Sequence, residues 1–134
     1  EDVRYQRNRI RHRIIPELKA INPIVSDAIV RLGASVREDI SLISNLTDMA
    51  FDELVTISDE GAFISRRGLR KKPLAIQRRL WQRLVSIFDP EIKLTTAHQE
   101  QLLDIVNTGE KKTFNIKSIK VSAQCDTIKV YCKH

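Results

Sequence analysis

The sequence predicts a mostly α-helical protein that ends in a small β element. This is an α+β fold with a long central helix, shorter helices and short antiparallel strands. Two observations predict it. Apolar residues recur every three or four positions through most of residues 3–106. After residue 112 the pattern changes to short runs rich in β-branched residues, separated by polar turns. With 134 residues and 42% hydrophobic content, the chain can bury one core.

The first helix is expected over residues 3–14, with Asp2 as its N-cap. Pro16 then starts a second, short helix. Asn22 and Pro23 are a strong start signal for a third, because an N-cap side chain is followed by proline at the first helical position. This third helix should be about 30 residues long, since its apolar pattern continues without interruption.

The long helix carries one continuous apolar stripe. A lone stripe of this length would leave a large exposed patch. We therefore expect another helix to cover it or, in a homodimer, a second copy of the chain. The stripe consists of Val25, Ile29, Leu32, Val36, Ile40, Ile43, Thr47, Ala50 and Leu54.

The remaining elements are shorter. Residues 54–65 place Asp59-Glu60-Gly61 between apolar residues, which predicts a short hairpin or an irregular turn. A helix should begin at Pro73 and end at Phe88, with Leu74 on its buried side. Thr96 with Gln99 forms a capping box for the next helix. Three strands are expected over residues 113–116, 119–123 and 127–132.

Positive charge is concentrated in two segments of this chain, whose formal net charge is +6. Residues 4–13 hold five arginines, and residues 66–83 hold eight basic residues and no acidic one, whereas residues 34–60 are mainly acidic. Such clustering favours an acidic partner, of which nucleic acid is the commonest. No apolar run reaches the length of a membrane span, so we expect no membrane partner. Two cysteines without C-x-x-C spacing fit a cytoplasmic protein and no known zinc pattern.

The first basic cluster is a candidate binding site. In a helix, Arg7 and Arg11 share a face with Arg4, and Asn8 lies beside them. Guanidinium groups can hold phosphates or a carboxylate with two hydrogen bonds each. His12 follows; we interpret it as a structural or solvated histidine rather than a general base, because no proton-donating partner can be named.

The second basic cluster should contact a nucleic-acid backbone. Its first five residues are expected in a loop ahead of a helix, with Gly68 in a tight turn, so that flexible cations precede a rigid row. Trp81 could stack on a base, but its spacing favours the core. The cluster comprises Arg66, Arg67, Arg70, Lys71, Lys72, Arg78, Arg79 and Arg83.

Two segments resemble bacterial tRNA(Ile)-lysidine synthetases. Residues 7–18 read R-N-R-I-R-H-R-I-I-P-E-L. They resemble the segment that closes the catalytic domain of that family, in which R-N-x-I-R-H is followed by two aliphatic residues, proline and leucine. Residues 72–80 resemble a proline-started helix of the family that carries Q-R-R. The two segments occur in the family's order.

The resemblance implies an ATP-dependent carbon–nitrogen ligase. It adenylates the wobble cytidine of an isoleucine tRNA with ATP and Mg²⁺, and the amine of L-lysine then displaces AMP. The family's S-G-G-x-D-S phosphate loop is missing here, so we expect an inactive fragment without catalytic residues or a cofactor of its own. Residues 1–21 would be the tail of the catalytic domain, residues 22–57 a linker helix and residues 58–134 a tRNA-binding domain. Arg7, Asn8 and Arg11 would border the catalytic cleft. The alternative is an unrelated nucleic-acid-binding or oligomerisation module.

Overall fold

The computed structural model describes residues 3–132 and confirms the predicted α+β class. The chain divides into two compact units, Glu1–Ser41 and Leu42–His134, and helix α3 (Val25–Leu54) contributes to both. The predicted N-cap Asp2 lies outside the described residues. The domain boundaries expected from the sequence stay predictions.

The first unit begins with three consecutive helical segments: α1 (Val3–Arg9), the π-helical η1 (Ile10–Ile14) and α2 (Ile15–Ile21). Across η1 the backbone N–H of Ile15 donates to the carbonyl of Ile10, five residues earlier. This wider turn, which the sequence did not predict, lies directly ahead of Pro16. In a regular α-helix the proline ring would clash with the carbonyl four residues before it. The helical path continues past the proline.

Helix α3 confirms the predicted long helix and its stripe, but the stripe has two environments. Within the second unit Thr47, Ala50 and Leu54 are buried. Within the first unit Ile29 and Ile40 are 55% and 52% exposed. Residues 3–132 therefore leave the N-terminal part of the stripe uncovered, and its expected burial stays a prediction.

A five-stranded antiparallel sheet forms one layer of the second unit, with the order β1-β2-β5-β4-β3. The β1–β2 hairpin confirms the hairpin alternative for residues 54–65, and the three predicted C-terminal strands are also confirmed. Because β2 pairs with β5, the early hairpin and the C-terminal strands belong to one sheet. The strands are β1 (Val55–Ser58), β2 (Gly61–Ser65), β3 (Lys112–Ile116), β4 (Ile119–Gln124) and β5 (Thr127–Cys132).

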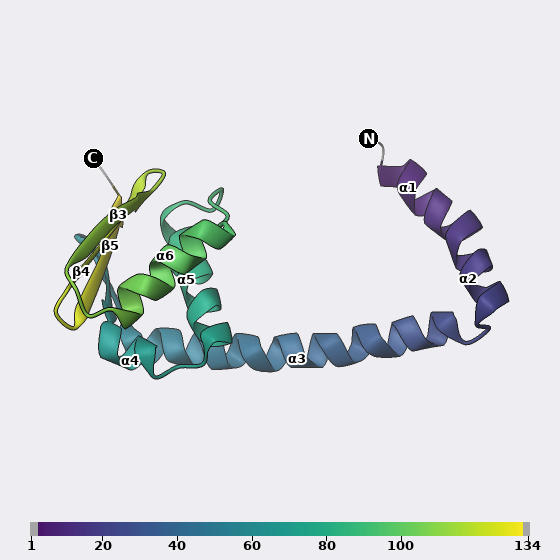
Figure 1. Cartoon of the computed structure of the whole chain (residues 1–134), viewed down its shortest axis with the longest axis horizontal. Helices are drawn as coiled ribbons and strands as arrows, with labels where there is room; N and C mark the ends of the chain where they lie inside the picture. The colour runs from purple at the N-terminus through teal and green to yellow at the C-terminus, as the bar shows by residue number, and fades with distance from the viewer. Residues whose placement is uncertain (1–2, 133–134) are drawn as a thin grey trace. The chain divides into compact units, whose positions relative to one another are not determined.

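Helices α5 (Leu74–Phe88) and α6 (Thr96–Asn107) lie on one side of the sheet (Figure 1). Their apolar faces join alternate strand residues in one core, where Trp81 is 1% exposed, as its spacing predicts. Leu74 was expected to be buried but is 48% exposed. The capping box of α6 lies one residue earlier than predicted: it consists of Thr95 and His98, because Thr95 is the extended residue before the helix.

The expectation of a loop at residues 66–70 is wrong, because these residues form the short helix α4 (Arg66–Arg70). Ser65 caps it, since its hydroxyl accepts the backbone N–H of Gly68 at 3.1 Å. Gly68 is not in a turn. A Cβ atom at this position would overlap the side chain of Leu54, so α4 approaches α3 closely only because residue 68 has no side chain.

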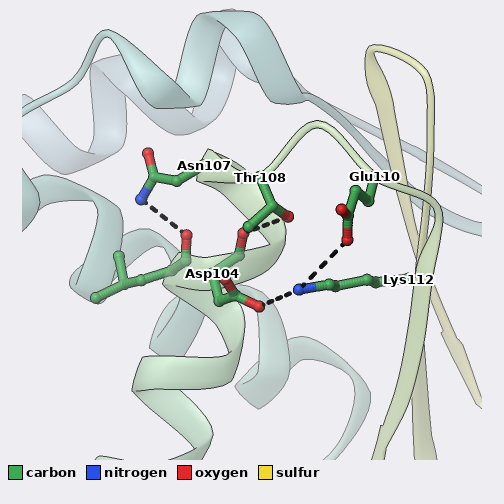
Figure 2. A network of polar contacts seen from close by, with 6 residues as sticks. Asp104, Asn107, Thr108, Glu110 and Lys112 are labelled. Atoms are coloured by element: carbon green, nitrogen blue, oxygen red, sulfur yellow. Dashed lines mark hydrogen bonds and ion pairs between the residues drawn. The ribbon is translucent and has the colours of Figure 1, made fainter.

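A polar network joins the end of α6 to the start of β3 (Figure 2). The ammonium group of Lys112 donates to the Asp104 carboxylate at 2.5 Å and lies 3.9 Å from that of Glu110. The hydroxyl of Thr108 and the amide of Asn107 donate to carbonyls of the last helical turn. The two side chains therefore add second hydrogen bonds to carbonyls of the last helical turn, since that of Asp104 already accepts the backbone N–H of Thr108 at 3.0 Å.

Replacing Gly68 by alanine should lower the free energy of unfolding by about 1–3 kcal/mol, because the added methyl group overlaps a packed side chain. Gly33→Ala is the matched control: its Cβ would have only a 3.9 Å contact, and alanine favours the helix by about 0.5–1 kcal/mol. Urea denaturation followed by circular dichroism measures both. Equal effects of the two substitutions would contradict the close approach of α4 to α3.

Replacing Asp104 by asparagine should lower the pKa of Lys112. In the wild-type chain the hydrogen bond that the Lys112 ammonium donates to Asp104 raises that pKa above its ordinary value of 10.5. Because the pKa is raised in the folded state, the stabilisation is present below 10.5 and is lost as the pH rises through the folded pKa. NMR titration of the Lys112 side chain measures the change. Glu110→Gln should change the pKa less, and a larger effect of that variant would contradict this assignment.

Candidate nucleic-acid interface

Five residues of the second basic cluster are exposed on α4, α5 and the segment between them. They are Arg67, Arg70, Lys71, Arg78 and Arg79, which we call the basic surface. No carboxylate within residues 3–132 forms a salt bridge with any of them. Their charges are therefore available to an external partner.

Both ends of the basic surface lie beside helix α6. Arg70 donates from Nη2 to the carbonyl of Asn107, the last residue of α6. Arg78 lines a pocket of about 300 Å³ together with Gln99 and Leu103, also on α6. The guanidinium groups of α4 and α5 thus border the same helix.

Two further cations of the second basic cluster form salt bridges within the second unit. Lys72 donates to the Glu53 carboxylate at 2.6 Å. Arg83 forms a salt bridge with Asp48 and lies over the ring of Phe51, 4.4 Å from its centroid. Both cations face acidic residues of α3, so their charges are largely neutralised.

Arg66 differs from the rest because it is only 4% exposed. Its Nη1 donates to the carbonyl of Cys125 at 3.2 Å, and its backbone N–H donates to the carbonyl of Asp126 at 2.7 Å. Arg66 therefore connects α4 to the turn between β4 and β5.

The candidates of the first cluster lie in the other unit. Arg7 and Asn8 belong to α1, whereas Arg11 and His12 belong to η1, and all four are exposed. The i→i+5 bonding of η1 changes the three- and four-residue spacing of a regular α-helix. The shared face expected for Arg7 and Arg11 stays a prediction.

The sequence did not predict the aromatic residues on the outer face of the sheet. Phe63 and Tyr131 are half-buried there, and the ammonium group of Lys129 lies 5.1 Å and 5.4 Å from the centroids of their rings. Lys120 lies 5.9 Å from the ring of Tyr131. Aromatic and basic side chains on an open sheet are typical of surfaces on which bases stack. The signal was the alternation of apolar and polar residues in the last strands.

Within residues 3–132, no three His, Cys, Asp or Glu side chains lie close enough together to hold a metal ion. The helices of that same part of the chain are all too short or too polar to cross a membrane.

Comparison with known proteins gives no match to a family model, but several curated relatives carry one name. A tRNA(Ile)-lysidine synthase of Geobacter sulfurreducens is 32% identical over 87 residues, 64% of this chain and 18% of the relative. One from Streptococcus gordonii is 30% identical over 105 residues, 78% of this chain and 22% of the relative.

A third, from a Thermotoga species, is 61% identical over 31 residues, 23% of this chain and 8% of the relative. The aligned residues span about a fifth or less of the length of these relatives. The resemblance predicted from the two motifs is confirmed, and over most of its length the chain is similar to a part of the tRNA(Ile)-lysidine synthases.

Proposed function

We propose that this chain binds tRNA as part of a tRNA(Ile)-lysidine synthase. The observation that carries the proposal is the basic surface, five exposed cations without carboxylate partners in the described chain. The name of the relatives, tRNA(Ile)-lysidine synthase, suggests that the nucleic acid is tRNA. The charge pattern alone would fit any polyanion.

The basic surface suits backbone binding rather than sequence reading. Cations on α4 and α5 can each replace a counterion condensed on a phosphate, which gives affinity that falls with salt. In the first unit, Arg7, Asn8 and Arg11 would act near the reacting groups. Interactions there contribute mainly to turnover, because they strengthen towards the transition state. His12 would support that segment without acting as a base.

The chemistry of the whole enzyme is part of the proposal. It would adenylate the wobble cytidine with ATP, and the amine of L-lysine would displace AMP. The residues of this chain do not fit ATP: Gly33 and Gly68 lie inside helices, and Gly61 and Gly109 stand alone. None of them belongs to a glycine-rich run whose N–H groups could cradle phosphates. ATP and Mg²⁺ would therefore bind elsewhere in the enzyme. The enzyme would act on tRNA in the cytoplasm.

Association through α3 is a second candidate function. Four stripe residues of the first unit are 43–64% exposed: Ile29, Leu32, Val36 and Ile40. An exposed apolar row of this length is typical of an interface. Pairing with a second copy of the chain would bury it and is compatible with tRNA binding.

Lys71→Ala should weaken tRNA binding and reduce the salt dependence of the association constant by about one unit of slope, because one phosphate contact is lost. Lys72→Ala, at the next residue, is the matched control. Its ammonium is already paired with Glu53, so its removal should change the slope less. Filter binding of tRNA to the chain across a range of salt concentrations measures both.

A result in which both variants have the wild-type slope, or in which the chain shows no salt-dependent binding to tRNA, would contradict RNA binding by the basic surface. A larger effect of Lys72→Ala would contradict the pairing argument.

Ile40→Asp should dissociate a dimer formed through α3, because it places a charge in the apolar row. Ser41→Asp adds the same charge at an exposed position outside the row and should leave the dimer intact. Sedimentation velocity at several concentrations measures the mass. A wild-type chain that stays monomeric at high concentration would rule out this association.

A further inference from the structure

A pocket of about 340 Å³ lies where α4, the end of α6 and the β4–β5 turn meet. Arg66, Arg67 and Arg70 line it, together with one acidic residue, Asp126. Three arginines and one aspartate therefore contribute to the lining. The volume exceeds the roughly 30 Å³ of a water molecule several times, so a small hydrated anion fits.

Arg66 is the unusual member of this lining. It is 4% exposed, and its Nε and Nη2 atoms have no hydrogen-bond partner within residues 3–132. No carboxylate in that part of the chain lies within salt-bridge distance of its guanidinium group. Buried charges are normally paired, because an unpaired one loses its hydration without compensation.

The acidic residue does not neutralise the pocket. Asp126 Oδ1 accepts the backbone N–H of Arg67 at 2.7 Å, and Oδ2 lies 3.5 Å from the Ser65 hydroxyl. Both carboxylate oxygens are thus directed at the start of α4.

We propose that this pocket binds a single phosphate group. Arg67 and Arg70, which are exposed, would donate hydrogen bonds to its oxygens. Arg66 would attract it by a charge that solvent screens weakly, and its free Nε and Nη2 could turn to the ligand. The inference deepens the proposed function and rests on it for the source of the phosphate, an RNA phosphodiester rather than free phosphate.

The first test compares thermal unfolding of the chain in sodium phosphate and in sodium chloride of equal ionic strength. Phosphate should raise the melting temperature of the wild-type chain, because a ligand that binds only the folded state stabilises it. Phosphate also stabilises proteins without binding, because it is excluded from their surface. The rise in melting temperature that remains in Arg66→Met gives an upper limit for this non-specific effect. This variant keeps the apolar stem and removes the charge. It should bind inorganic phosphate about tenfold more weakly, as expected for one lost charge-assisted hydrogen bond.

A structural role for Arg66 predicts the opposite behaviour. If the residue served only to hold the Cys125 carbonyl, Arg66→Met would lower the melting temperature in chloride and leave the phosphate-dependent shift unchanged. The proposal expects little loss of stability in chloride, because the variant removes an unpaired buried charge. Lys93→Ala removes an exposed cation outside the pocket and should keep the full phosphate shift.

Amide NMR locates the site and covers the case in which Arg66→Met does not fold. Inorganic phosphate should move the amide signals of Arg67, Gly109 and Asp126. Arg67→Ala changes only an exposed side chain, so it should fold and should reduce these shifts. Unchanged wild-type signals, or equal shifts in wild type and Arg67→Ala, would overturn the proposal.

A short single-stranded RNA then identifies the source of the phosphate. RNA that moves the same signals and competes with inorganic phosphate supports a backbone phosphate. Phosphate binding without such competition assigns the pocket to a free phosphate and overturns the RNA source. Salt-dependent tRNA binding with a pocket insensitive to phosphate would defeat this inference alone. A phosphate-binding pocket on a chain that does not bind tRNA would defeat the proposed function alone.

Discussion

Asp126 connects two parts of the chain that are 59 residues apart in sequence. Its carbonyl accepts the N–H of Arg66 and its carboxylate accepts the N–H of Arg67, so the β4–β5 turn supplies the acceptors that the first turn of α4 lacks. A helix of five residues has little stability of its own. The position of α4, and with it the orientation of its arginines, therefore depends on this turn and on the β2–β5 pairing beside it.

The same architecture divides the basic residues into different roles. Acidic residues of α3 neutralise Lys72 and Arg83, which lie on the side of the unit that packs against that helix. Lys71, Arg78 and Arg79 lack such partners and face solvent. The acidic residues of α3 thus neutralise part of the second basic cluster and leave the basic surface positively charged. A localised basic surface is better suited to a polyanion than an even distribution of the same charges.

Stability and binding make different demands on α4. Gly68 allows close packing against Leu54, which is a structural requirement. Arg66 satisfies only one of its nitrogens within the described chain, by a bond to the Cys125 carbonyl. A buried side chain selected for stability alone would be paired or apolar. Residues that lower stability without an internal reason are common at binding sites, where the partner supplies the missing contacts.

The sequence by itself determined the fold class, the long helix, the hairpin and the C-terminal strands, because these follow from local periodicity and turn residues. It also located both basic clusters and the core position of Trp81. Only the tertiary structure decided that residues 66–70 form a helix, that Arg66 is buried and that Lys72 and Arg83 are paired. These features depend on partners far along the chain, such as Asp126, Glu53 and Asp48. Local sequence patterns carry no information about which distant residues will meet.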